Sequence, residues 1–314
     1  MNLLQFSVPL LFLSLIIKFI LDPLSYGANI LTSHDNGNIL LLTAHPDDEC
    51  MFFAPTIQSL VQQRQAEERL AQSQGKRVQG GELYSLCLSV GNAEGLGDIR
   101  RRELEGSLDV LGVARGKRWV LDHPQLQDNM TQQWDSVLVA EVIKPYLLKH
   151  NITTILTFDE YGISGHANHY SLPKGVLHLI STSLSSPSYL NNRPPPRLFT
   201  LISVPVYRKF LGLHSLIYNK LRIYATSYLQ GPQRQHTSVI PMTFIAGLFE
   251  YVTALEAMLQ HQSQLVWFRW LYVTFSRYMW VNEWVEVVPP AMQNSSGVDY
   301  EAEGKEGWSR LLLF

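Results

Sequence analysis

Residues 38–49 read Asn-Ile-Leu-Leu-Leu-Thr-Ala-His-Pro-Asp-Asp-Glu, and this stretch decides the fold. Its apolar run, 39–42, is continuous rather than alternating, which is typical of a strand buried on both faces of a parallel sheet. Apolar side chains then recur at helical spacing through about residue 65. The histidine and the three acidic residues therefore lie in a strand-to-helix turn. In open α/β folds, ligands bind at this edge of the sheet, beyond the carboxyl ends of the strands.

Length and composition limit the class of protein. The chain has 314 residues, of which 46% are apolar and 17% charged. This length predicts one domain of about 200 to 250 residues with additional segments. A net charge of −2 gives no electrostatic reason to bind nucleic acid. Cys50 and Cys87 both lie in apolar segments, which excludes a disulfide framework and favours a reducing compartment.

The N-terminal segment differs from the rest of the chain. From Leu3 onward about 19 residues are mostly apolar, with Lys18 as their one charge, and this length is close to what spans a bilayer. The alternative is a cleaved signal peptide, which requires basic residues before the apolar run. Met1 and Asn2 supply none. We predict a retained transmembrane anchor over 1–22, then a linker over 23–37.

The central part of the chain alternates between strand and helix patterns. This alternation predicts an α/β fold, a Rossmann-like and mostly parallel sheet with helices on both faces. The expected domain covers 38–285 and is followed by a polar tail, 286–314. Further strands are expected at 83–90, 118–121, 152–158 and 198–206, helices from about 98 and from 134, and a Ser/Asn/Pro-rich loop at 181–197.

Two later stretches, 207–229 and 264–284, mix aromatic residues with arginines. Such a mixture is typical of a membrane interface. It is equally typical of a protein core in which arginine stems are buried and their charged ends reach water. The sequence leaves both interpretations open.

A second polar cluster follows the strand at 152–158. It contains His166 and His169, which lie three residues apart and therefore share one face of a helix. The loop that carries them leaves the same edge of the sheet as the loop after residue 43. We therefore expect the two clusters to meet.

The combined residues are suited to a catalytic zinc site, which has three protein ligands and one open position. His45, Asp48 and one histidine of the 166/169 pair supply the ligands. Asp47 is then free to take a proton from water, and the second histidine can stabilise an oxyanion. The predicted reaction is metal-assisted hydrolysis of an amide or ester.

Several residues have a second interpretation. The acidic run alone could cap a helix, and the two histidines alone could lie on the surface. Their expected meeting at one sheet edge favours the metal site. Arg100, beside a Gly-rich loop, binds an anionic or hydroxylated substrate or is a solvated helix residue. Asp128 is a candidate partner of the ligands, and Asp159 is expected to be structural.

These motifs resemble those of the PIG-L (LmbE-like) deacetylases. The matching stretches are 44–49 with 51–55, 89–92, 100–113 and 157–169. A late stretch, 261–269 with 275–278, is similar to the eukaryotic members that act on a glycolipid, and is not expected in bacterial small-thiol deacetylases. The resemblance covers about residues 38–282.

The resemblance implies a set of roles. His45, Asp48 and His169 would bind Zn²⁺, Asp47 would be the general base, and His166 would stabilise the oxyanion. It further implies an endoplasmic-reticulum membrane enzyme whose catalytic domain faces the cytosol. Its substrate would be N-acetylglucosaminyl-phosphatidylinositol, from which it releases acetate.

Two other functions stay open at this point. A deacetylase for a soluble N-acetylglucosamine conjugate would use the same residues. A catalytically inactive membrane scaffold would keep the fold without the metal. The chain also departs from the family pattern through longer loops near 65–80 and 181–197, a longer region at 210–240 and a polar tail after about residue 288. These departures bear on membrane contacts more than on chemistry.

Overall fold

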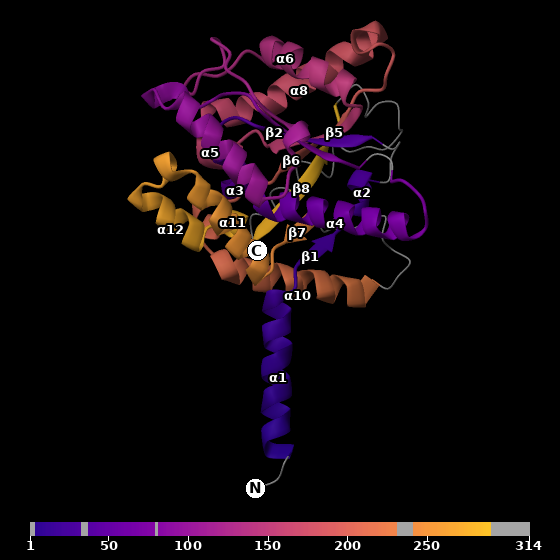
Figure 1. The fold of residues 1–314 in the computed structure, drawn as a ribbon, viewed down its shortest axis with the longest axis vertical. Helices are drawn as coiled ribbons and strands as arrows, with labels where there is room; N and C mark the ends of the chain where they lie inside the picture. The colour runs from indigo at the N-terminus through magenta and orange to yellow at the C-terminus, as the bar shows by residue number, and fades with distance from the viewer. Residues whose placement is uncertain (1–3, 33–36, 79–80, 231–240, 290–314) are drawn as a thin grey trace.

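A single mixed sheet organises the residues that the computed structural model describes, namely 4–32, 37–78, 81–230 and 241–289 (Figure 1). The strand order is β1-β7-β8-β6-β5-β2-β3-β4. The strands are β1 Leu24–Tyr26, β2 Asn38–Thr43, β3 Leu83–Cys87, β4 Arg118–Val120, β5 Ile152–Phe158, β6 Arg197–Leu201, β7 Met242–Ile245 and β8 Val281–Val287.

The half of the sheet around β2 is parallel, as predicted. β2 pairs in parallel with β3 on one side and β5 on the other, and β4 and β6 continue the parallel pairing outward. The side chains at 39–42 are almost completely buried. β2 is therefore a central strand, which explains its unbroken apolar run.

The other half of the sheet is antiparallel and was not predicted. β8 pairs with β6 and β7, and β1 pairs with β7. β1 and the short helix α2 (Asn29–Thr32) both lie in the segment expected to be a linker. Strands of three or four residues, such as β1 and β7, are too short to show a readable alternation. The sheet is therefore mixed, and the expectation of a mostly parallel sheet holds only from β6 to β4.

Helices cover both faces of the sheet, as predicted. α6 and α8 pack together on one face, and α4, α5 and α11 lie on the other (Figure 1). The helices are α3 Asp48–Phe52, α4 Ala54–Ser73, α5 Gly97–Val110, α6 Ser136–Lys149, α7 Gly162–Gly165, α8 Ala167–Ser185, α9 Val206–Lys209, α10 Gly212–Gln230, α11 Leu248–Gln260 and α12 Trp267–Phe275. Short 3₁₀ turns are η1 Asn92–Glu94, η2 Arg115–Lys117, η3 Pro187–Leu190, η4 Gln262–Gln264 and η5 Arg277–Met279.

Part of the expected loop at 181–197 is helical. α8 continues to Ser185, and the Ser-rich end of this helix satisfies its own polar groups. The Ser183 hydroxyl donates to the Ile180 carbonyl at 2.7 Å, and the Ser185 hydroxyl to the Ser181 carbonyl at 3.0 Å. Serine side chains that donate hydrogen bonds to the preceding helical turn are compatible with a helix, although a Ser-rich segment suggests a loop.

The N-terminal helix α1, Leu4–Leu21, projects from the body (Figure 1). Its base is held by α10, because the Lys220 ammonium donates to the Phe19 carbonyl at 2.5 Å and also to the Asp22 carbonyl. Among the residues whose placement is described, no helix has the length and apolar character needed to cross a bilayer. The predicted anchor over 1–22 therefore has no support from the structure, and its residues 1–3 lie outside the described ranges, as does the tail from residue 290.

One buried side chain joins the antiparallel half of the sheet to the helices beside the predicted acidic cluster. The Asn282 amide oxygen of β8 accepts from the Thr56 hydroxyl at 2.8 Å, and its amide nitrogen donates to the Phe52 carbonyl at 2.8 Å. The Trp284 indole donates to the same Thr56 hydroxyl at 2.9 Å. Asn282 is completely buried.

We predict that Asn282→Ala lowers the free energy of unfolding by about 3 kcal/mol, because it leaves buried partners without hydrogen bonds. Urea denaturation measures this change. Glu256→Ala, at an exposed site on α11, is the control and is expected to change stability by less than about 0.5 kcal/mol. An equal effect of the two substitutions would contradict the role of Asn282.

Candidate active site

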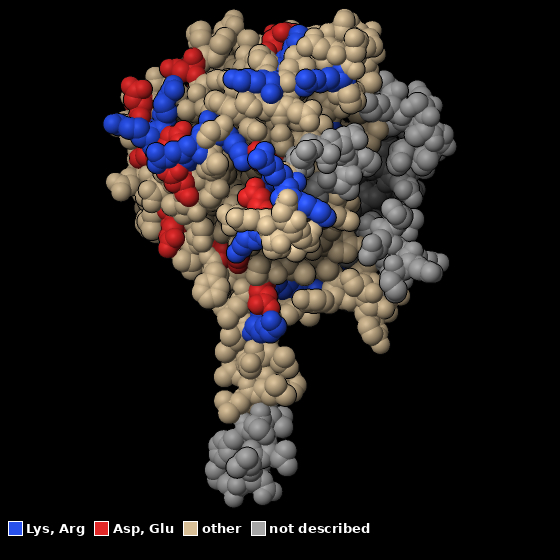
Figure 2. All heavy atoms as spheres, turned by 45° about the vertical axis from the view of Figure 1, so that its right-hand side comes forward, with Lys and Arg blue, Asp and Glu red and all other residues tan. Residues whose placement is uncertain are grey.

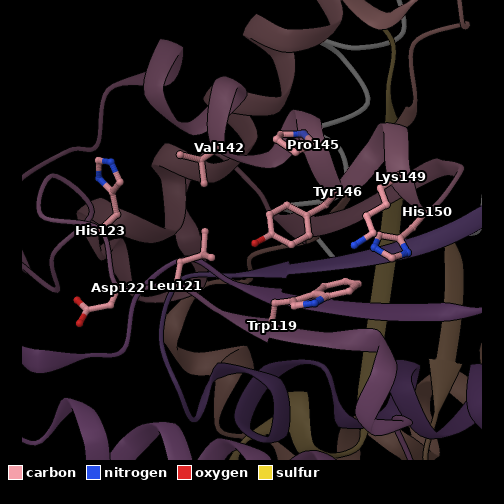
Figure 3. A pocket seen from close by; sticks show the side chains of 9 residues that line it. All are labelled: Trp119, Leu121, Asp122, His123, Val142, Pro145, Tyr146, Lys149 and His150. Carbon is pink, nitrogen blue, oxygen red and sulfur yellow. The ribbon is translucent and has the colours of Figure 1, made fainter.

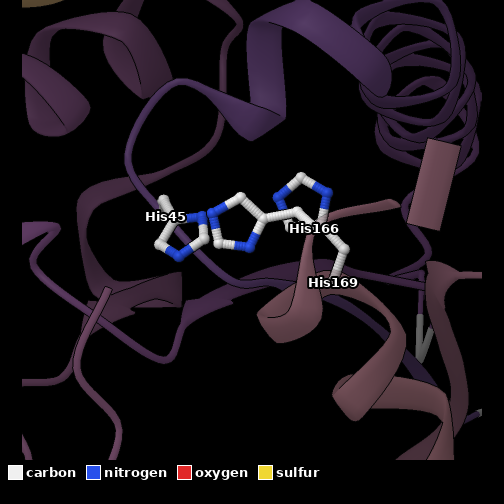
Figure 4. Close-up of side chains that lie close together, drawn as sticks. All are labelled: His45, His166 and His169. Atoms are coloured by element: carbon white, nitrogen blue, oxygen red, sulfur yellow. The ribbon is translucent and has the colours of Figure 1, made fainter. Parts of the chain in front are cut away.

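The two predicted clusters meet at one edge of the sheet. β2 and β5 are parallel neighbours, so the loops that follow Thr43 and Phe158 leave the sheet side by side. Figure 4 shows the rings of His45, His166 and His169 grouped together. Their nitrogen donor atoms lie within 4.8 Å of one another. The expected convergence of these distant segments is therefore confirmed.

The turn before α8 sets the direction of His169. Gly162 has a φ of +57°, and a Cβ there would lie 2.8 Å from the Cβ of His169, so the turn requires glycine. The His169 Nδ1 lies 3.1 Å from the Gly162 carbonyl oxygen, and this contact makes Nδ1 the donor. The Phe158 ring stacks on the imidazole at 4.1 Å between centroids. His169 therefore presents Nε2 to the site.

Asp48 faces His169. Its Oδ2 accepts from the backbone N–H groups of Ala44 and His45, both at 2.9 Å, and its Oδ1 lies 3.2 Å from the His169 Nε2. Burial alone would raise the pKa of Asp48. The adjacent His169 lowers it by more than burial raises it, so the pKa of Asp48 is well below its usual range. The carboxylate is thus ionised, and one of its oxygens is directed at the histidine cluster.

His45 is buried beside two further polar side chains. Its Nε2 lies 2.9 Å from the Asn168 Oδ1 and 3.3 Å from the Asp128 Oδ1. Burial lowers the pKa of His45 to about 4, although Asp48 and Asp128 oppose the shift. The imidazole is therefore neutral near pH 7, the form in which histidine binds metals. The sequence did not identify Asn168, although it lies between the two predicted histidines.

Asp47 has an unusual backbone. Its φ is 107°, in the left-handed region that costs a residue with a Cβ about 1 to 3 kcal/mol. Its N–H donates to the Glu49 Oε2 at 3.1 Å, and its Oδ2 lies 2.9 Å from the Arg269 Nη2 on α12. Burial raises the pKa of Asp47, and the charge of Arg269 opposes that rise. Two side chains therefore fix Asp47 beside Asp48.

Glu49 is itself fixed from behind by the C-terminal part of the chain. Its Oε1 lies 2.7 Å from the His261 Nε2 and accepts from the Ser107 hydroxyl at 2.5 Å. All three side chains are completely buried. Burial raises the pKa of Glu49, but His261 lowers it below the usual value. From sequence alone His261 had no predicted role, and its only signal was its place in the late stretch 261–269.

Glu49, Cys50 and His261 form a second group of possible metal donors. This group does not suit a metal. Burial raises the pKa of the Cys50 thiol well above its usual value, so the sulfur stays protonated, and the thiol lies 3.2 Å from the Asp47 carbonyl. The Glu49 oxygen that faces His261 is already bonded to Ser107. The group therefore serves as internal support for Asp47.

Arg100 joins three loops at the rim of the site. Its guanidinium donates to the Gly91 carbonyl at 2.9 Å, to the Pro46 carbonyl at 3.1 Å and to the Asp128 Oδ2 at 3.1 Å. Burial raises the pKa of Asp128, but His166, His45 and Arg100 lower it to about 2. Asp128 therefore lies beside the ligands, as the sequence indicated. Substrate binding by Arg100 stays a prediction.

Asp159 lies at the end of β5 but not in the histidine cluster. Its carboxylate accepts from the Ser203 hydroxyl at 2.6 Å, the Ser203 N–H at 2.7 Å and the Gly162 N–H at 3.0 Å. These bonds hold the turn that begins at Gly162. The structural interpretation of Asp159 is in agreement with these contacts.

A separate hollow of about 550 Å³ lies along β4 and α6 (Figure 3). Its lining is Trp119, Leu121, Asp122, His123, Val142, Pro145, Tyr146, Lys149 and His150. None of the predicted site residues is among them. The candidate site is therefore defined by the side chains at the ends of β2 and β5 and not by this hollow.

The donors at the ends of β2 and β5 fit a divalent metal. His45 is neutral, Asp48 is ionised, and the Nε2 of His169 faces the free oxygen of Asp48. His166 completes the group with its Nε2 at 3.6 Å from the Asp128 Oδ1. Imidazole and carboxylate donors of this kind suit zinc and other first-row divalent metals.

Comparison with known proteins places both clusters inside one family match. The family described as PIG-L: GlcNAc-PI de-N-acetylase matches residues 40–180, which contain both clusters. A Bos taurus relative named N-acetylglucosaminyl-phosphatidylinositol de-N-acetylase is 35% identical, covering 77% of this chain and 81% of its own. Relatives from Schizosaccharomyces pombe (32%, covering 77% and 84%) and Dictyostelium discoideum (33%, covering 79% and 93%) are named as probable enzymes of the same kind.

A solved structure of N,N'-diacetylchitobiose deacetylase from Pyrococcus horikoshii aligns over 94% of this chain and 98% of its own. Its identity is 15% and its TM-score is 0.45.

We predict that Asp47→Gly is more stable than Asp47→Ala by about 1 kcal/mol or more. Both variants lose the carboxylate, but only glycine adopts a φ of 107° without strain. Thermal and urea unfolding of the two variants measure the difference. Equal stabilities would show that the left-handed backbone at this position is not strained.

Proposed function

Because the chain belongs to the PIG-L family of N-acetylglucosaminyl-phosphatidylinositol de-N-acetylases, we propose that it removes the acetyl group of N-acetylglucosaminyl-phosphatidylinositol. The products are acetate and glucosaminyl-phosphatidylinositol, and the reaction is an early step in the synthesis of glycosylphosphatidylinositol anchors. The observation that carries this proposal is the meeting of His45, Asp48 and His169 beside Asp47 at one edge of the sheet.

In the proposed site, His45, Asp48 and His169 would hold Zn²⁺. Zinc bound by such ligands supplies Lewis-acid chemistry, because it lowers the pKa of water and polarises a carbonyl. The protein prepares the ligands before any ion binds. The Gly162 carbonyl orients His169, and the backbone N–H groups of Ala44 and His45 orient Asp48.

Asp47 is the proposed general base. Its carboxylate takes a proton from the water that adds to the amide carbonyl carbon. It then returns this proton to the nitrogen as the C–N bond breaks, so that the amine leaves neutral and acetic acid is formed, which releases its own proton to water and becomes acetate. The raised pKa of Asp47 supports this role, because a base with a higher pKa accepts a proton more readily.

His166 is the proposed donor to the oxyanion. Its backbone N-caps α8, and its Nδ1 accepts from the Asn168 N–H at 3.2 Å. This bond makes Nε2 the ring nitrogen that carries hydrogen and directs it toward Asp128 at the mouth of the site. From there it can donate to the oxygen that gains negative charge as water adds.

We propose that the enzyme works at the endoplasmic-reticulum membrane with its catalytic domain facing the cytosol. A lipid substrate requires access to a bilayer, and α1 carries exposed apolar side chains at Leu10, Leu11, Phe12 and Leu13. The two cysteines are free and buried, which agrees with a reducing compartment.

Acetate release from N-acetylglucosaminyl-phosphatidylinositol by purified protein tests the proposal. We expect removal of the metal by a chelator to abolish turnover and zinc to restore it. Asp47→Asn is expected to reduce kcat by about 100-fold or more while zinc content stays at one per chain, because it removes the base but not the ligands. Turnover that survives chelation would overturn the metal-dependent mechanism.

The same assay separates the two other functions. A deacetylase for soluble conjugates would hydrolyse a headgroup that lacks the lipid as fast as the complete glycolipid. An inactive scaffold would contain no stoichiometric zinc by elemental analysis.

We propose that Arg100 also contacts the substrate, and Arg100→Lys tests this role. If the guanidinium binds substrate, the variant raises KM with little change in kcat. If it acts only by joining the loops at Gly91, Pro46 and Asp128, the variant lowers kcat and the melting temperature instead. Steady-state kinetics and thermal unfolding distinguish the two results.

A further inference from the structure

The outer side of α12 is an exposed apolar surface next to the candidate site. Trp267 is 75% exposed, and Phe268, Trp270 and Leu271 are each about half exposed. We refer to these residues, together with Phe275 at the end of α12 and Phe210 and Leu211 just before α10, as the α12 surface. The two segments are in contact, because a Cβ on Gly212 would lie 3.1 Å from the Phe275 carbonyl oxygen.

The inner side of the same helix contacts the catalytic loop. Arg269 pairs with Asp47 at 2.9 Å, and the Tyr272 ring packs edge-on against Phe52 at 5.8 Å between centroids. α12 is therefore a thin layer with the site on one side and exposed aromatic residues on the other. A molecule that rests on the α12 surface is therefore separated from the catalytic loop by this one helix.

The two segments that form this surface lack acidic side chains, which argues against a partner that binds through basic residues. Neither 206–230 nor 266–277 contains an acidic residue. The basic residues of the second segment are turned inward, because Arg269 pairs with Asp47 and Arg277 with Glu283. An apolar aromatic surface of this kind suits the interfacial region of a bilayer, where aromatic and apolar side chains are favoured.

The helix α1 adds a second exposed apolar segment beside α10. The side chains of four successive residues, 10–13, are each more than half exposed, so the exposed apolar side chains are not confined to one face of this helix. On the face shown in Figure 2, the charged side chains lie over the upper body and at the base of α1, and the described part of its shaft below that base shows none. α10 links α1 to α12, because Lys220 holds the α1 base and Gly212 contacts Phe275.

We propose that the α12 surface is the contact through which the protein rests on a lipid bilayer, with α12 lying flat at the interface. A helix of nine residues is about 14 Å long, which suits this orientation. The contact would bring the mouth of the site to the depth of a lipid headgroup. The purpose of this contact rests on the proposed function, because only a lipid substrate requires it. The contact itself can be tested without measuring activity.

An environment-sensitive fluorophore placed on the full-length chain tests the contact. Phe268→Cys carries the probe, and Val137→Cys on the exposed side of α6, in the opposite layer, is the matched control. The native Cys50 and Cys87 are completely buried and do not compete for the label. The vesicles are phosphatidylcholine, with and without phosphatidylinositol, and sedimentation confirms that the protein is bound.

We expect the probe at 268 to gain severalfold in emission on vesicles and to be quenched by nitroxide-labelled lipid, while the probe at 137 does neither. A probe at 268 that stays in water on vesicle-bound protein overturns the proposal. Shielding of this probe without vesicles as the protein concentration rises also overturns it, because a second copy then covers the α12 surface.

Kinetics separate this proposal from the proposed function. Trp267→Ser combined with Phe268→Ser is expected to raise the apparent KM for glycolipid in vesicles by about tenfold and to leave hydrolysis of the lipid-free headgroup unchanged, whereas Val137→Ser changes neither. Equal KM values for the double variant and the unaltered protein would overturn the contact. If the unaltered protein hydrolyses neither substrate but the probe enters lipid, the proposed function fails and the α12 surface stands.

Discussion

The site depends on the left-handed backbone of Asp47. In an ordinary helix start, the side chains of residues 47 and 48 would point about 100° apart around the helix axis. The positive φ of Asp47 changes this arrangement, so that the Asp48 side chain faces His169 and the Asp47 side chain faces Arg269. This conformation is unfavourable on its own, and it persists because the Glu49 carboxylate holds the Asp47 N–H. His261 and Ser107 hold that carboxylate in turn. A series of buried hydrogen bonds thus holds Asp47 in its strained conformation, and this conformation lets two adjacent acids point in different directions.

The parallel pairing in the sheet brings residues that are distant in the sequence close together. β2 and β5 are neighbours although more than a hundred residues separate them in the chain, and both run toward the same edge. The glycine-dependent turn at 162 then directs His169 back over the end of β2. The surroundings set different charges on the two donors, because the adjacent His169 keeps Asp48 ionised while burial keeps His45 neutral. The geometry is therefore ready before a ligand arrives.

The sequence predicted those parts of the molecule that have a strong local signal. The unbroken run at 39–42 identified β2, and the acidic and histidine motifs identified the ends of two strands. The supports around Asp47 have no such signal, since a single His261 and a single Arg269 acquire their partners only through tertiary packing. The antiparallel strands β1 and β7 were missed because three or four residues show no readable period. Family resemblance supplied the roles of individual ligands, which spacing alone left open between His166 and His169.

The Glu49–His261 pair has a consequence for synthesis of the chain. The family match ends at residue 180, yet the partner of Glu49 is His261, and the strand β8 lies further along the chain. A nascent polypeptide that still lacks these residues has no rear support for Asp47 and no strand between β7 and β6. A ribosome-bound chain should therefore lack the preformed site until residues 261–287 have emerged.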